Sequence, residues 1–336
     1  MAEIIVEKEW TKEPAGRRIF GNFIESGFGR QVNGMWSEML YNRAFRDVPA
    51  IKIATWEWLG LDKEHYNSNA PFWHSGYEEN DWEVIGAPER EHTCGTHTYK
   101  GMTSLLLKNT DGSECGLLQK GLHLQKGKRY QFRIFAGVRG DMSEAGLNGF
   151  GDTIHSEKAE LLTVKIGTQE TSFALTTVPR LFTWEWEEAC GGNAQICLTF
   201  SFPGTLVLSF ASLMPADNLG GWRADVVEKL KEAAPSVVRF PGGCFVSFYN
   251  WESSIGDRDR REPQPSFYWG GLEENDVGLD EFLQLSQLVG FEPQLCFNMM
   301  TSEPFKARQM VEYLNAPENV GMGRLRMQNG HKEPYG

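Results

Sequence analysis

The sequence lacks long apolar runs. None of its 336 residues lies in a stretch that approaches the ~20 apolar residues needed to cross a bilayer. The opening, Met1 to Trp10, also lacks a basic segment followed by an apolar one, which is the pattern of a secretory signal. With Met1 taken as the natural start, we predict a cytoplasmic protein that does not associate with membranes.

Basic residues and cysteines are also scarce. Lys and Arg total 33 against 45 Asp and Glu, which gives a net charge of −12. No basic stripe is present, and a surface that binds phosphates needs one, so we expect no nucleic-acid partner. The six cysteines show no disulfide spacing. Cys94 and His97 form a C-x-x-H pair with no second pair at zinc spacing, so we predict no metal site.

Hydrophobic residues make up 40% of the chain, enough for substantial cores, and tryptophan is unusually frequent, with 11 copies. Indole faces can stack on sugar rings, although core packing is the more common role of a single tryptophan. At ~150 residues per domain the length corresponds to about two domains.

The middle of the chain, residues 47–213, alternates apolar and polar residues in short runs separated by Gly, Asn and Asp. Short strands at this spacing, with almost no helical periodicity, indicate a β-sandwich. The predicted strands are Thr103–Lys108, Tyr130–Val138, Glu160–Ile166, Ser172–Leu175, Ile196–Phe202 and Thr205–Ala211.

The flanking regions have a different period. Residues 18–25 predict a short buried strand, and residues 38–45 a helix. After residue 215 strands and helices alternate, which is typical of a parallel sheet or barrel. The predicted helices are Ala224–Ala234, Leu279–Val289 with Gly290 as C-cap, and a third capped by Ser302 with Pro304 in its first turn; the strands are Ser236–Phe240 and Gln294–Asn298.

These flanking regions supply three strands and three helices, whereas a (β/α)8 barrel needs eight of each. The chain therefore encodes either a small open α/β unit or the first three βα units of a barrel. Unprotected parallel edges are unfavourable, so we favour the incomplete TIM barrel. The predicted domains are residues 1–46 with 215–336 as the partial barrel, and residues 47–213 as an inserted β-sandwich.

Several segments, in the same order along the chain, resemble the α-L-arabinofuranosidases of glycoside hydrolase family 51. A single Pro-Gly-Gly would carry little weight, but five segments in order are specific. The segments are Phe20–Phe45 (FGNFIESGFGRQVNGMWSEMLYNRAF), Val238–Gly256 (VRFPGGCFVSFYNWESSIG), Trp269–Phe282 (WGGLEENDVGLDEF), Val311–Asn315 (VEYLN) and Asn329–Tyr335 (NGHKEPY). Separately, Gly101–Gly137 resembles the jelly-roll carbohydrate-binding modules of families 4 and 9.

The family resemblance implies a retaining, exo-acting glycosidase that releases arabinose from arabinan or arabinoxylan-type polysaccharides. Its two glutamates, one an acid/base and one a nucleophile, must stand ~5–5.5 Å apart, and the mechanism needs no metal or cofactor. The family places its acid/base in a Trp-Glu-x-Gly-Asn-Glu motif, which nothing after Tyr335 matches. We therefore expect an N-terminal fragment without catalytic residues, inactive alone. The implied partner is an arabinose-containing oligo- or polysaccharide, and a homo-oligomer is compatible with the full-length enzyme.

The resemblance also implies substrate-binding residues at the strand ends. Glu25 would accept hydroxyl hydrogen bonds in the −1 subsite, and Arg239 would support it beside the Pro-Gly-Gly turn. Phe23 and Cys244 would line the pocket, and Trp269 would stand beside the sugar. The structural alternatives are a salt bridge for Glu25 and Arg239, core packing for Phe23, and loop anchoring for Trp269.

Other polar residues receive weaker interpretations. Glu273, Glu274 and Asp276 predict a solvated acidic face. Asn298 is a weak candidate for the site, and His331 is expected to form structural hydrogen bonds. Two other functions stay open: a non-catalytic carbohydrate-binding protein whose working part is the β-sandwich, and a related barrel glycosidase with another sugar specificity.

Overall fold

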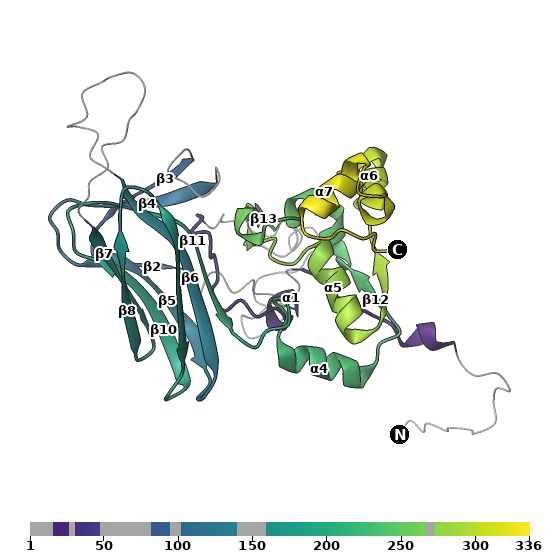
Figure 1. Ribbon diagram of the computed structural model, residues 1–336, viewed down its shortest axis with the longest axis horizontal. Helices are drawn as coiled ribbons and strands as arrows, with labels where there is room; N and C mark the ends of the chain where they lie inside the picture. Colours follow the sequence, from purple (N-terminus) through teal and green to yellow (C-terminus); the bar gives the residue numbers. More distant parts are fainter. Residues whose placement is uncertain (1–15, 27–30, 48–81, 95–101, 140–158, 267–271) are drawn as a thin grey trace, which may run out of the picture.

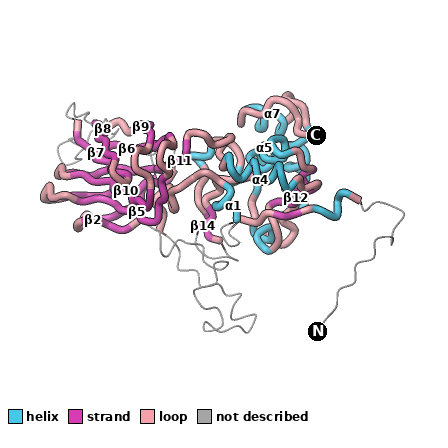
Figure 2. Tube along the Cα trace, turned by 90° about the horizontal axis from the view of Figure 1, so that it is seen from below, coloured by secondary structure: helices cyan, strands magenta, loops and turns pink. Residues whose placement is uncertain are grey.

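The computed structural model describes residues 16–26, 31–47, 82–94, 102–139, 159–266 and 272–336. Two parts lie side by side: a pair of facing sheets, and a helix-rich part that holds the C-terminal residues (Figures 1 and 2). Residues 31–47 run between them. None of the described helices combines the length and apolarity required to span a bilayer.

The first part consists of two five-stranded antiparallel sheets. One has the order β2-β5-β10-β7-β8, from Glu83–Ile85, Cys115–Leu124, Gly192–Phe200, Glu160–Ile166 and Gln169–Leu175. The other has the order β3-β4-β11-β6-β9, from Glu89–Cys94, Thr103–Asn109, Gly204–Pro215, Arg129–Arg139 and Arg180–Glu187.

Alternation along each strand explains why these sheets pack face to face. In β7 the side chains of Leu162, Val164 and Ile166 are fully buried, whereas Leu161 and Lys165 on the opposite face of the strand are exposed. Inward-facing residues from both sheets form one apolar cluster. Leu40 and Phe45 from the preceding segment join this cluster. Each of the six strands predicted between residues 103 and 211 overlaps an observed strand, although Phe202 lies beyond the end of β10, and β5 and β9 were not predicted.

The second part contains a parallel three-stranded sheet in the order β1-β12-β15. Its strands are Asn22–Phe23, Val237–Phe240 and Glu292–Leu295. Its helices are α1 (Gln31–Met35), α4 (Ala224–Ala233), α5 (Leu279–Val289), α6 (Pro304–Asn315) and α7 (Gly321–Gln328). Strand β13 (Gln264–Pro265) pairs antiparallel with β14 (Leu272–Glu273).

The second apolar core contains one face of helix α5, whose apolar residues recur at helical spacing. Phe282 and Leu285 of α5 are fully buried, and the Phe282 ring stacks on Phe240 of β12 with centroids 4.8 Å apart. Gly290 ends α5 in the left-handed conformation at φ 94°, as the sequence predicted. The predicted helices at residues 224 and 279 are confirmed.

Two predictions for the N-terminal region are wrong. Residues 18–25 do not form one strand: Arg17–Phe20 is a 3-10 helix and the strand is limited to Asn22–Phe23. Residues 38–45 are not helical, because tertiary partners satisfy their backbone groups. The Tyr41 N–H donates to Gln119 Oε1 at 3.0 Å, and Gln119 Nε2 donates to the Tyr41 carbonyl at 2.8 Å.

Three further differences lie near the C-terminal end of the sequence. The N-cap of α6 is Glu303 and not Ser302. The strand predicted at residues 294–298 is shifted to Glu292–Leu295, so Asn298 lies in the following turn. Helix α7 was not predicted, because its two glycines and weak apolar periodicity resemble a loop.

Candidate active site

The candidate site lies where parallel strands β1 and β12 end. Phe23 pairs with Arg239 in the register of these strands, and the Ile24 N–H donates to the Arg239 carbonyl at 2.9 Å. Glu25 follows immediately, so its side chain emerges at the carboxyl edge of the sheet. In open and closed parallel sheets alike, ligand sites form at this edge.

Glu25 is only 3% exposed, and hydrogen bonds hold both its side chain and its backbone. Its Oε1 accepts a hydrogen bond from the Phe245 N–H at 2.8 Å. Its own N–H donates to Oε1 of Gln31 at 2.8 Å, and Gln31 lies at the start of α1. The loop after β12 therefore holds the carboxylate, and the start of α1 holds the Glu25 backbone.

Two glycines make this arrangement possible. Gly242 adopts φ +109°, and a Cβ placed on it would lie 2.3 Å from the Glu25 Cβ. A Cβ on Gly243 would lie 3.0 Å from Glu25 Oε2. A side chain at Gly242 would clash with Glu25, so the Pro-Gly-Gly turn lets the backbone pass close beside the carboxylate.

Arg239 lies on β12 with its guanidinium carbon 4.9 Å from the centroid of the Phe23 ring. Its Nε is buried and has no hydrogen-bond partner in the part of the chain that the structure describes. Phe23 is 45% exposed, so core packing, the alternative role for this ring, does not describe it. Arg239 therefore supplies a positive charge and an N–H donor without a partner among the described residues, and Phe23 supplies an exposed apolar surface beside it.

The remaining predicted site residues are less closely connected. Cys244 begins the 3-10 helix η4 (Cys244–Phe248) and is exposed. Trp269 lies outside the described residues. Burial raises the pKa of the nearby Cys296 thiol, and the positive charge of Arg239 opposes this effect. The structure thus brings together Phe23, Glu25 and Arg239, while Cys244 lies beside them on the surface.

Two loop residues have structural roles. Trp251, in the 3-10 helix η5 (Trp251–Ser254), is buried against Tyr313 and donates from Nε1 to the Lys306 carbonyl at 3.2 Å. Asn298 organises its turn, because its Oδ1 accepts from the backbone N–H groups of Met300 and Thr301 at 3.1 and 3.0 Å. Neither side chain is free to bind a ligand.

The acidic run at residues 273–276 is not a solvated face, so that prediction is wrong. Glu274 and Asp276 are 8% and 7% exposed. Burial raises the pKa of Glu273 to about 8, and the neighbouring carboxylates of Glu274 and Asp276 add to the effect. Asp276 pairs with Arg43, whose role the sequence interpretation missed. The dense charges of residues 257–262 (DRDRRE) were the available signal for a buried ionic network.

Residues 229–336 match the family model "Alpha-L-arabinofuranosidase 1 domain". Alpha-L-arabinofuranosidase C of Emericella nidulans is 41% identical over 121 residues, which cover 36% of this chain and 24% of the relative. The intracellular exo-alpha-(1->5)-L-arabinofuranosidase 1 of Bacillus subtilis is 36% identical over 122 residues, 36% of this chain and 24% of that relative. The match thus spans about a quarter of the length of these curated relatives.

Among solved structures, an arabinose-bound GH51 α-L-arabinofuranosidase superimposes with a TM-score of 0.71 over 97% of this chain and 54% of that chain. Its sequence identity is 19%, so this likeness concerns the fold alone. The sequence match covers the Arg239 turn and the helices behind it, and the structural match extends to both antiparallel sheets. Residues 229–336 are therefore similar in sequence to part of the α-L-arabinofuranosidases named above.

Proposed function

We propose that this chain forms the N-terminal part of an exo-acting, retaining α-L-arabinofuranosidase that releases arabinose from arabinan or arabinoxylan-type polysaccharides. The observation that carries the proposal is the buried Glu25 carboxylate, held at the end of β1 by the turn that follows Arg239. The family match over residues 229–336 and the named activity of the relatives support it. The Bacillus subtilis relative is named intracellular, which supports a cytoplasmic location.

The proposed architecture follows from the two parts. The three parallel strands and their helices are the first units of an incomplete (β/α)8 barrel, formed by residues 1–46 and 215–336. Residues 47–213 are an inserted jelly roll. The parallel sheet order and the fold likeness to a GH51 enzyme support this division.

In this proposal the residues described here bind and orient the sugar. The Glu25 carboxylate accepts hydrogen bonds from sugar hydroxyls, and Nε of Arg239 donates to a ring substituent. The Phe23 ring covers an apolar face of the sugar. Retaining hydrolysis further requires two carboxyl groups ~5–5.5 Å apart, one as nucleophile and one as acid/base. We assign neither role to Glu25, because its Oε1 is already held by the Phe245 N–H.

The test measures affinity for methyl α-L-arabinofuranoside, since the residues assigned here bind rather than cleave. Glu25→Gln keeps the shape of the side chain and removes its charge. We expect the affinity to fall by roughly 10- to 150-fold, the range for hydrogen bonds to a charged group. Glu83→Gln is the matched control, because Glu83 forms only an exposed pair with Lys120.

Unchanged affinity in Glu25→Gln, or no binding by the unmodified chain, would contradict the proposal. Methyl β-D-xylopyranoside serves as the competing sugar in the same titration. Tighter binding of the xyloside would assign the chain to a barrel glycosidase of different sugar specificity.

A second candidate function has a specific observation in its favour. A hollow of about 870 Å³ lies on the outer face of the β2-β5-β10-β7-β8 sheet, opposite to the apolar core. The outward-facing residues of β7 and β10 line it, including Thr163, Lys165 and Thr199. Polar side chains on a sheet face suit hydroxyl-rich ligands, so this hollow supports a non-catalytic carbohydrate-binding role.

Affinity electrophoresis of the whole chain in gels containing arabinoxylan tests this role. Retardation that Lys165→Ala abolishes and Glu25→Gln leaves intact would support polysaccharide binding by the sheets. Equal mobility with and without the polysaccharide would exclude it.

A further inference from the structure

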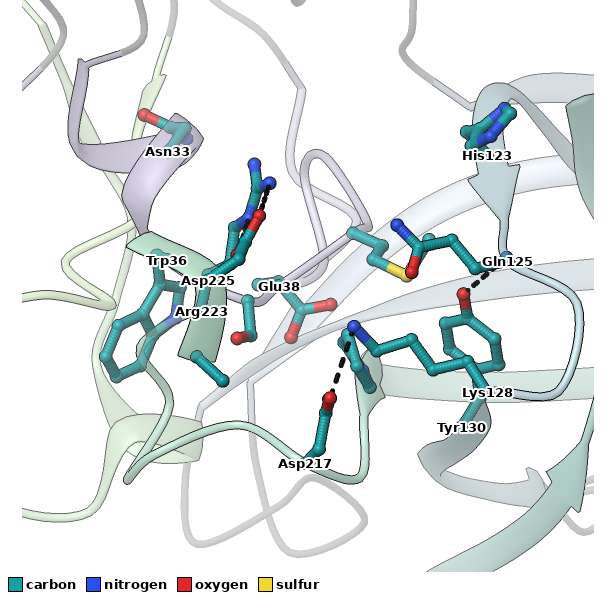
Figure 3. A pocket seen from close by; sticks show the side chains of 14 residues that line it. Asn33, Trp36, Glu38, His123, Gln125, Lys128, Tyr130, Asp217, Arg223 and Asp225 are labelled. Atoms are coloured by element: carbon teal, nitrogen blue, oxygen red, sulfur yellow. Dashed lines mark hydrogen bonds and ion pairs between the residues drawn. The ribbon is translucent and has the colours of Figure 1, made fainter. Parts of the chain in front are cut away.

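A second cavity, separate from the strand ends, lies where the two parts of the molecule meet. It has a volume of about 320 Å³. Several segments line it (Figure 3). The segment after α1 contributes Trp36, Ser37 and Glu38. Strand β5 contributes His123, the turn between β5 and β6 contributes Lys128, and the N-cap of α4 contributes Arg223. It shares no lining residue with the Glu25 site.

Two buried polar groups in the lining have no hydrogen-bond partner among the described residues. Trp36 is 6% exposed and Ser37 is 2% exposed, and neither Nε1 of Trp36 nor Oγ of Ser37 has a hydrogen-bond partner. In Figure 3 the Trp36 indole nitrogen is turned toward the middle of the hollow. Buried polar atoms are nearly always hydrogen-bonded, so these two atoms indicate a ligand that supplies an acceptor and a second polar group.

The Trp36 ring is fixed before any ligand arrives. Its edge packs against Trp222 at 90°, with ring centroids 5.2 Å apart. The Arg258 guanidinium carbon lies 6.0 Å from the Trp36 centroid. A donor held in this way loses little conformational freedom on binding, which favours affinity.

The charges around the cavity are already paired, and this decides the class of ligand. Lys128 Nζ lies 3.3 Å from Asp217 Oδ2, and Arg223 donates to both oxygens of Asp225 at 3.1 and 2.6 Å. Glu38 accepts from Ser212, the Leu213 N–H and Arg258. An anion would meet three carboxylates with no unpaired cation, and a cation would meet no uncommitted carboxylate.

We propose that this cavity binds a neutral monosaccharide, with Nε1 of Trp36 and Oγ of Ser37 hydrogen-bonded to its hydroxyl groups. Because a hydroxyl group can both donate and accept a hydrogen bond, it can bond either member of the Lys128–Asp217 and Arg223–Asp225 ion pairs. The volume is at the small end of the ~300–1,000 Å³ typical of small-molecule sites, which fits one or two sugar rings. Because the lining comes from both parts, the bound sugar bridges the sheets and the α/β part.

The experiment titrates the whole chain with D-glucose and with D-glucuronate by ligand-observed NMR. The two probes share a ring and differ in one carboxylate. We expect D-glucose to bind and D-glucuronate to bind more weakly, because of Glu38, Asp217 and Asp225. Trp36→Phe and Ser37→Ala should each weaken glucose binding by roughly 2- to 12-fold, the range for one hydrogen bond.

A third variant tests occupancy without removing either donor. Ala224 lines the cavity, and Ala224→Leu fills it at the first residue of α4, where leucine is a good helix former. We expect it to abolish glucose binding while the circular dichroism spectrum stays unchanged. Glu25→Gln should bind glucose like the unmodified chain, which separates this proposal from the site at the strand ends.

Three results would overturn the proposal. One is the absence of glucose binding. Another is binding that Glu25→Gln abolishes and Ala224→Leu preserves, which would place the sugar at the strand ends. The third is stronger binding of D-glucuronate than of D-glucose, which would make the cavity an anion site.

Discussion

Nε of Arg43 donates a hydrogen bond to Asp276 Oδ1 at 2.7 Å, and this contact ties the segment after α1 to the loop before α5. Both side chains are less than a tenth exposed. Burial opposes the charge on Arg43, but the carboxylates of Asp276, Asp259 and Glu38 outweigh it and raise the Arg43 pKa. The guanidinium therefore stays charged at neutral pH.

Arg43→Ala should lower the free energy of unfolding by ~3–5 kcal/mol, because it removes a buried cation from Asp276 and Asp259, leaving Asp276 with only Arg258 at 3.5 Å among the described residues. Urea denaturation followed by tryptophan fluorescence measures the change. Lys120→Ala is the control: its ion pair with Glu83 is about half exposed, so the loss should be ~0–1 kcal/mol. Similar losses of unfolding free energy in both variants would show that the buried ion pairs of Arg43 stabilise the fold no more than an exposed ion pair does.

Gly242→Ala should displace Glu25. The added Cβ would lie 2.3 Å from the Glu25 Cβ, and the backbone at φ +109° is unfavourable for alanine. We expect a loss of stability of ~2–5 kcal/mol, as strain of ~1–2 and overpacking of ~1–3 kcal/mol add.

Gly127→Ala is the matched control, because φ is +76° there and no atom lies within 4 Å of the added Cβ. It should lose only the ~1–2 kcal/mol of backbone strain. Thermal unfolding compares the two variants. An equal loss at Gly127 would show that contact with Glu25 is unimportant.

Glu273 predicts a pH dependence of stability. Its pKa rises from 4.5 to about 8 in the folded chain, so the folded state holds this proton more tightly than the unfolded state. The contribution is complete below pH 4.5 and is lost as the pH rises through 8. The Glu273 contribution to the free energy of unfolding should therefore decrease by up to a few kcal/mol across this range.

Glu273→Gln cannot ionise and should abolish this part of the slope. Urea midpoints at several pH values between 5 and 8, compared with those of the unmodified chain, measure the difference. Parallel curves for the two proteins would rule out Glu273 as the source.

The buried carboxylate of Asp280 contacts residues of the segment after α7. Asp280 accepts hydrogen bonds from the hydroxyls of Tyr313 and Tyr335, each at 2.8 Å at its shortest. Burial and the Asp280 charge raise the pKa of both phenols, so the phenols stay protonated and donate. His331 lies 3.9 Å from the same carboxylate.

Tyr335→Phe should lower stability by ~1.5–3 kcal/mol, the range for a hydrogen bond to a charged group. The double variant with Tyr313→Phe should be non-additive, because both hydroxyls serve one carboxylate. Denaturation of the two single variants and the double variant measures the coupling. Additive losses would contradict a shared network.

The sequence by itself determined the regular elements whose periodicity reports burial directly. Strand β7 alternates inward Leu162 and Val164 with outward residues, and α5 repeats Phe282 and Leu285 at helical spacing. The sequence predicted that Glu25 and Arg239 lie near one another, because each lies at or next to the carboxyl end of a predicted parallel strand. These features depend on local sequence and on the geometry of a strand or helix, so a pattern is enough to find them.

Tertiary structure decided the features that depend on partners distant in the chain. Residues 38–45 are irregular because Gln119 bonds the Tyr41 backbone, and Asp276 is buried because Arg43 neutralises it from 233 residues away. The cavity beside Trp36 exists only where the two parts meet. No local period encodes such contacts, since their free energy comes from pairing polar groups that the fold itself removes from water.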